Sequence, residues 1–458
     1  MGAFSFRTQR VEGGSRAALR VFFAALSAAL LATTAFAAIL HVTSFPTGAE
    51  VWVDGSFTGH VTPMGVALSE GDYEVTVRIP DSGWNPDTRM VTITPGKNDL
   101  SVTLLPILTQ GPPGPQGPPA DISQTYSQDV DCEGVGSVND ALAEAAGWPG
   151  PVHITVKGVC TEAVRIDRDR VTLQGASVGA GLSAPSPNSI PLEIGGARDT
   201  RLRNLTITGG INGLVIEGRS QVDAEGLAVT GNSSAGVTVS ESNVELRNSH
   251  LIGNPGLGVD VRRGGYLRLQ NSQVSDNGGF GVLATASHIV IEDTVVDGNG
   301  SQGVSGFSGA TFEILGSALT NNHHTGLSLL MSSADVELST ISGNALSGVD
   351  LSGSSLSLGD FTVIEYNLDG SGVDMKLGSR LLLIGATIYR NGGDGISVGD
   401  VSVVDAGYWG EENHVTYNEA YGIACAGPPA VAQIARGALI HYEGNVKGDT
   451  NCPEYPEN

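Results

Sequence analysis

The chain has 458 residues, with 24 lysines and arginines against 48 aspartates and glutamates, so its formal net charge is −24. A surface this acidic argues against nucleic acid and anionic lipid as partners. Aromatic residues make up only 5% of the sequence, which fits a narrow core without room for rings.

Residues 1–37 have the pattern of a secretory signal peptide. Four arginines between Arg7 and Arg20 precede an apolar run at 21–31, and Ala35-Phe36-Ala37 offers a cleavage site. The run is short and no basic flank follows it, which disfavours a retained membrane anchor, and no later segment is apolar for long enough to span a bilayer. We therefore expect export to a secreted, periplasmic or cell-surface location. The mature chain would lack four arginines and one glutamate and would carry a net charge of −27.

Residues 38–106 alternate apolar and polar residues in short runs that turn residues separate. Strands of period two at this spacing predict a small antiparallel β-sandwich. The segments 45–55, 62–63 and 71–77, which include Pro46-Thr47-Gly48 and Asp54-Gly55, resemble the PEGA domain family. The resemblance implies a sandwich attached to a bacterial envelope protein, and it carries over no catalytic residue.

Residues 107–128 form a predicted linker rich in proline and glycine. Its centre, Gly111 to Pro119, reads GPPGPQGPP, which is three collagen-type triplets. Three triplets are too few to hold a triple helix unaided, so we expect a stiff polyproline spacer of about 3.1 Å per residue. The alternative is a short trimerisation segment, which leaves the oligomeric state open.

Residues 129–458 contain one pattern that recurs about every 23 residues. An asparagine stands four residues before a glycine, or five in one case, and Val, Leu or Ile follows that glycine. The asparagines are Asn232, Asn254, Asn277, Asn299, Asn322, Asn344, Asn367, Asn391 and Asn418. A fixed period of this length predicts a solenoid of near-identical units.

Each unit divides into three short apolar runs, as in 267–269, 272–274 and 281–284. Three strands and three turns per unit predict one coil of a triangular parallel β-helix, and some ten coils predict a rod on the order of 50 Å at about 4.8 Å per coil. The asparagines are assigned a structural role: they bend the chain at one place per coil and bond to their neighbours above and below. A second turn position, at Asn248, Asn271, Asp293 and Gly316, holds residue types that tolerate left-handed backbone.

A single amphipathic helix is predicted at 137–147, with Ser137 or Asn139 as its cap and Gly147 as its stop. Together with the runs Val156 to Glu162 and Val171 to Gly175 that follow, it resembles the start of pectate-lyase-like, right-handed parallel β-helices. That resemblance implies an N-terminal helix that covers the open end of the first coil. The predicted fold class is therefore all-β: a small sandwich followed by a capped right-handed β-helix.

The four cysteines fit an oxidising compartment. Cys132 and Cys160 flank the start of the repeats and Cys425 and Cys452 flank their end, so we favour these two pairs among three possible connectivities. No Cys-x-x-Cys spacing occurs, so we predict no metal site.

The candidate catalytic residues are ionisable residues at outward positions of neighbouring coils. Asp350 and Asp374 follow equivalent glycines in consecutive units, so they are expected about 5 Å apart, where they could share a cation or one raised pKa. Glu313 and Glu337 are a second candidate stack. For either pair a solvated carboxylate face is the favoured explanation, because a chain this acidic places carboxylates together by chance.

Candidate binding residues are basic. Arg262, Arg263 and Arg268, with Arg247, form a cluster that could take a carboxylate, although Arg262 could also pair with Asp260. The other candidates are Lys376, which follows Asp374 on the same face, and the adjacent His323 and His324.

The catalytic motifs of known β-helix enzymes are missing. The sequence contains no Gly-His-Gly, and Tyr421-Gly422-Ile423 is similar to the opening of the mannuronan epimerase motif but continues with Ala424-Cys425. We therefore expect a structural or carbohydrate-binding protein of the cell envelope, without a cofactor. The alternative is a divergent lyase or hydrolase of an acidic glycan, which would use Asp350 and Asp374 and, as a lyase, Ca²⁺.

Overall fold

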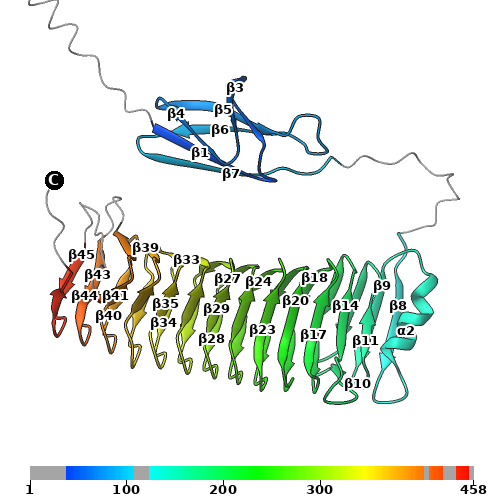
Figure 1. The fold of residues 1–458 in the computed structure, drawn as a ribbon. Helices are drawn as coiled ribbons and strands as arrows, with labels where there is room; N and C mark the ends of the chain where they lie inside the picture. Colours follow the sequence, from blue (N-terminus) through cyan, green and yellow to red (C-terminus); the bar gives the residue numbers. More distant parts are fainter. Residues whose placement is uncertain (1–37, 108–122, 407–411, 427–439, 453–458) are drawn as a thin grey trace, which may run out of the picture. The chain divides into compact units, whose positions relative to one another are not determined.

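The structure is a computed structural model that describes residues 38–107, 123–406, 412–426 and 440–452. The predicted signal peptide and the collagen-type triplets lie outside these ranges. The chain divides into two compact units, Met1–Gly117 and Pro118–Asn458, which are described separately (Figure 1). Within the described residues, no helix has the length and apolarity that a membrane crossing requires.

The first unit is a β-sandwich of a three-stranded and a four-stranded sheet. The first sheet contains β4 (Met64–Leu68), β1 (Ala38–Phe45) and β7 (Lys97–Thr103), and the second contains β3 (Ser56–Val61), β2 (Glu50–Val53), β5 (Gly71–Arg78) and β6 (Asp87–Ile93). Leu40, Val51 and Val77 are fully buried between the sheets. The pairings are antiparallel except for β1 with β7, which is parallel.

The second unit is a solenoid built from three parallel sheets of 13 strands each (Figure 1). Sheet 1 contains β8 (Tyr126–Asp131), β9 (Val152–Lys157), β12 (Val171–Gly175), β15 (Thr200–Arg203), β18 (Gln221–Glu225), β21 (Asn243–Arg247), β24 (Tyr266–Gln270), β27 (His288–Glu292), β30 (Thr311–Leu315), β33 (Ser333–Glu337), β36 (Ser355–Leu358), β39 (Arg380–Leu383) and β42 (Val403–Ala406).

The other two sheets follow the same order along the chain. Sheet 2 contains β10 (Val159–Thr161), β13 (Gly181–Ser183), β16 (Thr206–Thr208), β19 (Ala228–Thr230), β22 (His250–Ile252), β25 (Gln273–Ser275), β28 (Val295–Asp297), β31 (Ala318–Thr320), β34 (Thr340–Ser342), β37 (Val363–Glu365), β40 (Thr387–Tyr389), β43 (Asn413–Thr416) and β45 (Ile440–Glu443). Sheet 3 contains β11 (Val164–Ile166), β14 (Leu192–Gly195), β17 (Asn212–Glu217), β20 (Ala235–Ser240), β23 (Leu257–Arg262), β26 (Val282–Thr285), β29 (Val304–Phe307), β32 (Leu327–Leu330), β35 (Val349–Ser352), β38 (Val373–Lys376), β41 (Ile396–Gly399), β44 (Tyr421–Ala426) and β46 (Gly448–Thr450).

The solenoid has more coils than the ten that the asparagine repeat predicts. Thirteen strands per sheet at about 4.8 Å give a stack of roughly 58 Å. The additional coils lie mainly before residue 209, where the strands pair in the same way without the repeated asparagine. Strand β8 opens sheet 1 at Tyr126, within the stretch assigned to the linker.

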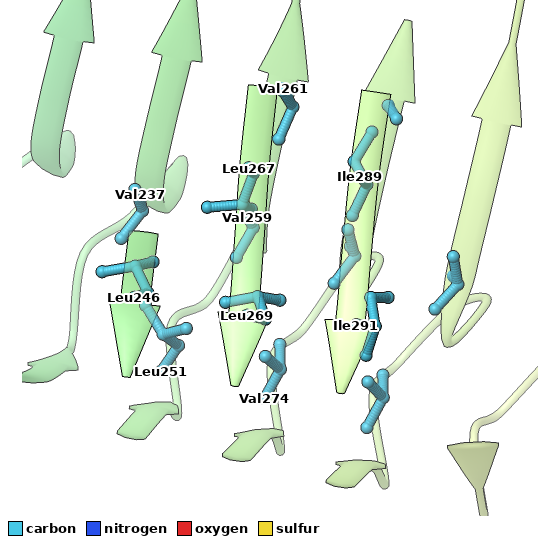
Figure 2. Packing of buried hydrophobic residues seen from close by; sticks show 14 of the residues in the cluster. Val237, Leu246, Leu251, Val259, Val261, Leu267, Leu269, Val274, Ile289 and Ile291 are labelled. Atoms are coloured by element: carbon cyan, nitrogen blue, oxygen red, sulfur yellow. The ribbon is translucent and has the colours of Figure 1, made fainter. Parts of the chain in front are cut away.

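Aliphatic side chains fill the narrow interior of the solenoid, and Figure 2 shows their packing in successive coils. In one coil, Val259 and Val261 come from sheet 3, Leu267 and Leu269 from sheet 1, and Val274 from sheet 2, and all are fully buried. Each stacks on an aliphatic residue in register on the next strand. Full burial of one such side chain contributes about 1.5–3 kcal/mol, so the stacks stabilise the whole length of the solenoid.

The repeated asparagines form a continuous buried ladder. The Asn277 side-chain Nδ2 donates to Asn299 Oδ1 at 2.9 Å, and the Asn277 backbone N–H donates to the same oxygen at 3.2 Å. The same two bonds connect each asparagine to the next from Asn232 onward, and the ladder extends one step further than the repeat, to Asn445.

The repeat glycine leaves room for this ladder. A Cβ on Gly281 would lie 2.8 Å from the Asn299 Nδ2 of the next coil and 2.6 Å from the Gly303 oxygen, so a side chain there would clash. Left-handed backbone falls on the residue before the asparagine, as at Asp276, and not on the asparagine itself. The second predicted turn column is left-handed, with φ from 46° to 58° at Asn248, Asn271, Asp293 and Gly316.

Both ends of the solenoid carry a disulfide. Cys132 pairs with Cys160 and Cys425 pairs with Cys452, which are the pairs that the sequence favours. Helix α2 (Val138–Glu144) lies against the first strands and is followed by the short 3-10 helix η1 (Ala145–Gly147) (Figure 1). Buried Val138 and Ala141 join its inner side to the solenoid core, so the helix covers the core at this end.

Candidate functional site

The predicted aspartate pair lies on neighbouring strands of sheet 3. Asp350 on β35 and Asp374 on β38 are register partners. Lys376 holds both: its Nζ is 2.6 Å from Asp374 Oδ2 and 3.8 Å from Asp350 Oδ1. Burial raises the pKa of the Asp350 carboxyl above its usual range, and the Lys376 ammonium opposes this rise.

Two further groups surround this pair. The His324 ring is close enough to Asp350 to oppose the rise in its pKa, whereas His323 is an exposed turn residue. Asp394, which the sequence did not single out, accepts a hydrogen bond from the Tyr421 backbone N–H at 2.9 Å. Burial raises the pKa of Asp394 as well.

The chemistry of this cluster is limited by its internal pairing. Ca²⁺ takes six to eight oxygen ligands, and an ion between Asp350 and Asp374 would have to displace the Lys376 ammonium. Over the described ranges, three or more ligand atoms of His, Cys, Asp or Glu come within metal-binding distance of one another only at Cys132, Cys160 and Glu162. The disulfide already uses both cysteines of that group, and Glu162 caps helix α2.

The predicted basic cluster does not assemble as one patch, so that interpretation was wrong. Arg262 lies on sheet 3, 3.5 Å from Asp260, whereas Arg268 and Arg247 lie on sheet 1. Arg268 pairs with Glu292 at 2.6 Å, and Arg247 pairs with two carboxylates. The turn between sheet 3 and sheet 1 separates Arg262 from Arg268 and Arg247, and adjacent acids neutralise all three.

A different set of arginines is left without partners. Among the residues that the structure describes, the side chains of Arg198, Arg219 and Arg263 make no hydrogen bond or ion pair. All three are exposed and lie in the turns that lead from sheet 3 into sheet 1. Arg198 precedes the repeat region, so the repeat pattern could not show that it shares a column with Arg219.

Two of these arginines line a pocket of about 450 Å³ at the edge of sheet 1. Arg198, Arg219, Glu241 and Gly264 each stand two residues before a strand, so four successive turns form one wall. The lining also includes Ser220 and Ser242 and the strand residues Gln221, Asn243 and Tyr266. A second pocket of about 230 Å³ shares Gln221 and Asn243 and continues along the same sheet.

An aromatic pair lies beside these pockets. The rings of Tyr266 and His288, register partners on β24 and β27, are stacked with centroids 5.5 Å apart. His288 also lines a third pocket of about 410 Å³ on sheet 1, with Glu313 and Glu337. The register partner of Glu313 is Asp335 and not Glu337, so the predicted glutamate stack is wrong by two residues.

The model of the right-handed beta helix region matches residues 192–339 and 319–432, which together are more than half of the chain. The chain therefore belongs to the right-handed β-helix family. The PEGA domain model matches residues 37–105. Comparison with curated protein sequences gave no match.

Several solved structures are similar in fold. The A-module of the Azotobacter vinelandii mannuronan C-5 epimerase AlgE6 is 19% identical, with 71% of this chain and 100% of that chain covered and a TM-score of 0.47. The Dettilon tailspike protein is 13% identical, with 67% and 64% covered and a TM-score of 0.47. A periplasmic alginate epimerase, AlgG, is 15% identical, with 65% and 77% covered and a TM-score of 0.44. Identities this low carry no residue role over to this chain.

Proposed function

We propose that the β-helix is a non-catalytic carbohydrate-binding rod of the cell envelope, and that sheet 1 binds an acidic glycan. The observation that carries the proposal is the pocket in which Arg198 and Arg219, both without acidic partners, lie beside Tyr266. A guanidinium binds a carboxylate through paired hydrogen bonds. In a chain with a net charge of −24, these two groups provide local attraction for an anion.

The neighbouring groups suit a sugar. The amides of Gln221 and Asn243 offer donors and acceptors for hydroxyl groups, and the stacked Tyr266 and His288 offer an apolar face with polar edges. The three pockets lie on one sheet between β15 and β33. Strands at about 4.8 Å intervals therefore present a row of side chains to a polymer that crosses them.

The proposed location is outside the cytoplasm, at the cell surface or in the periplasm. Two disulfides suit an oxidising compartment, and the PEGA domain is consistent with an envelope protein. The strong negative charge disfavours nucleic acid as the partner. A trimer formed through the linker remains a prediction, which sedimentation of the mature protein would test.

The test is calorimetric binding of a uronic-acid hexasaccharide to the mature chain. We expect a Kd that rises with salt, because the contacts are charged. The double variant Arg198→Ala/Arg219→Ala should weaken binding at least tenfold, and Tyr266→Ala should weaken it as well. The control is Arg380→Ala, which removes one guanidinium from sheet 1 at an arginine paired with Asp405. Equal loss in the control, or no binding by the parent chain, would reject the proposal.

A second candidate function is cleavage of the same glycan at the aspartate pair. The observation in its favour is the register of Asp350 with Asp374, together with the raised pKa of Asp350. Its test is product formation from uronic-acid polysaccharides with and without Ca²⁺. Turnover that Asp350→Asn abolishes would establish this function in place of the non-catalytic one, whereas binding without turnover supports the rod.

A further inference from the structure

Another pocket, separate from the three on sheet 1 and with different chemistry, lies near the C-terminal end of sheet 2. It has a volume of about 400 Å³ and spans β40, β43 and β45. Its lining includes Tyr389, Arg390, His414, Tyr417 and His441. We call it the tyrosine pocket. It is formed by strands other than those of the proposed acidic-glycan site, and no residue is common to the two.

Aromatic rings gather here in a chain that is otherwise poor in them. Tyr366 and Tyr389 meet edge to face with centroids 5.7 Å apart, and His414 and His441 are register partners with centroids 5.4 Å apart. After His250 on β22, the column that ends in these histidines holds no ring on six successive strands, where its residues are Gln273, Val295, Ala318, Thr340, Val363 and Thr387. The coil architecture therefore does not require rings at these positions.

Two of the tyrosine rings in this region are exposed at the protein surface. Tyr366 is 44% exposed and Tyr417 is 45% exposed, and both lie in left-handed turns, where φ is 52° and 54°. A bulky side chain in left-handed backbone is strained, and an exposed ring gains nothing from the core. A tyrosine at these two positions causes backbone strain and adds no core packing. Its presence there indicates a role in binding rather than in folding.

The charged groups at the tyrosine pocket are one guanidinium and several carboxylates. Arg390 lies over the rings of Tyr366 and Tyr389, with its guanidinium carbon 5.7 and 5.8 Å from their centroids, and its Nη1 donates to the Tyr366 hydroxyl at 2.6 Å. Glu443 provides one carboxylate opposite, 3.7 Å from His441 Nε2. Glu365 bonds the Tyr389 hydroxyl and Glu412 lies 3.9 Å from His441 Nδ1, so the surroundings of Arg390 hold no excess positive charge for a polyanion.

The tyrosines keep their hydroxyl protons. A hydrogen bond to Glu365 is the main cause that raises the pKa of Tyr389 to about 12, and a hydrogen bond to Glu443 raises the pKa of Tyr417. Their rings are therefore neutral stacking surfaces at physiological pH. Neutral rings flanked by one guanidinium and several carboxylates match a sugar ring with free hydroxyl groups, because the ring stacks and the hydroxyls bridge the charged groups.

We infer that the tyrosine pocket is a second carbohydrate site and that it binds an uncharged saccharide unit. The β-helix thus offers two sites of different selectivity on two of its sheets. The inference stands on the tyrosine pocket alone and holds whether or not Arg198 and Arg219 bind an acidic glycan.

The experiment is calorimetric titration of the mature chain with uncharged hexasaccharides of glucose, mannose, xylose and N-acetylglucosamine. We expect at least one to bind, with a Kd insensitive to salt, and we expect Tyr389→Ala and Arg390→Ala each to weaken it about tenfold or more. Arg390 is an exposed turn residue, so its variant tests the site even where Tyr389→Ala disturbs the strand. Arg380→Ala is the matched control, because Arg380 is paired with Asp405 and lines neither site, and this variant should bind as the parent does.

Three outcomes would overturn the inference. One is that none of the four hexasaccharides binds. A second is binding that both pocket variants leave unchanged. The third is that Tyr389→Ala weakens the uronic-acid hexasaccharide instead, which would make the pocket part of the acidic-glycan site.

Discussion

The ladder asparagines illustrate how one polar residue can fix the register of an entire solenoid. Asn299 Oδ1 accepts two hydrogen bonds from Asn277, while its Nδ2 donates to Asn322 Oδ1 at 3.0 Å and to the Val274 oxygen at 3.1 Å. The side chain is fully buried. Each amide is therefore satisfied only when the coils above and below are aligned with it.

Replacing Asn299 with alanine should destabilise the protein by about 1–3 kcal/mol, because it leaves buried donors on Asn277 without an acceptor. The measurement is the midpoint of urea unfolding followed by circular dichroism. Gln273→Ala provides the control, since this partly exposed side chain on β25 bonds only to Ser275. Equal midpoints for the two variants would contradict a stabilising role for the ladder.

At the scale of single elements, the cap depends on one carboxylate. Glu162 accepts from the Val138 backbone N–H at 2.7 Å, from the Asn139 backbone N–H at 3.2 Å and from the Ser137 hydroxyl at 2.9 Å. These groups begin helix α2, where backbone donors lack partners within the helix and the dipole favours negative charge. The carboxylate lies just after β10, so it connects the helix to the first full coil.

Glu162→Ala should loosen α2 by about 2 kcal/mol, because it removes charge-assisted hydrogen bonds from the helix start. Hydrogen exchange should speed up in residues 138–144 and remain unchanged in β24 to β30. The exposed Glu217 at the end of β17 supplies the control variant, Glu217→Ala. Unchanged exchange in α2 would show that its apolar contacts alone hold it.

Elements of this solenoid are predictable from sequence for a physical reason. Every coil requires inward valines, a ladder asparagine and a repeat glycine. The period of these residues can therefore be read from the amino-acid sequence. The ion-pair partners of an outward side chain depend instead on which acidic side chains lie within reach of it in the folded protein. Arg262 and Arg268 are six residues apart, yet they lie on different sheets beside different acids. That Arg198 and Arg219 have no acidic partner can therefore be recognised only in the structure, where the positions of the neighbouring acids are known.

At the scale of the molecule, the two proposed sites depend on different parts of one stack. The acidic-glycan site uses strands β15 to β24, whereas the tyrosine pocket uses β40 to β45. Coils in a solenoid contact only their neighbours, so stability is a sum of local contributions. Damage at one end should leave the site near the other end intact.

Removing a terminal disulfide tests this independence. The bonds close loops with sequence separations of 27 and 28, for which chain entropy predicts a loss of about 3–4 kcal/mol. In Cys425→Ser/Cys452→Ser, hydrogen exchange should speed up in β44 and β46 but not in β20 to β26. Because β45 carries His441 and Glu443, this variant should bind uncharged sugar more weakly and retain the uronic-acid ligand.

The matched variant, Cys132→Ser/Cys160→Ser, should show the opposite pattern, with faster exchange in α2 and β10 and with the tyrosine pocket unaffected. The physical reason is that each disulfide holds the outermost coils, which have neighbours on one side only, while interior coils are held from both sides by the ladder and the aliphatic stacks. If either variant instead accelerated exchange equally along all three sheets, the coils would unfold as one cooperative unit, and the two sites would then be coupled through the stability of the whole solenoid.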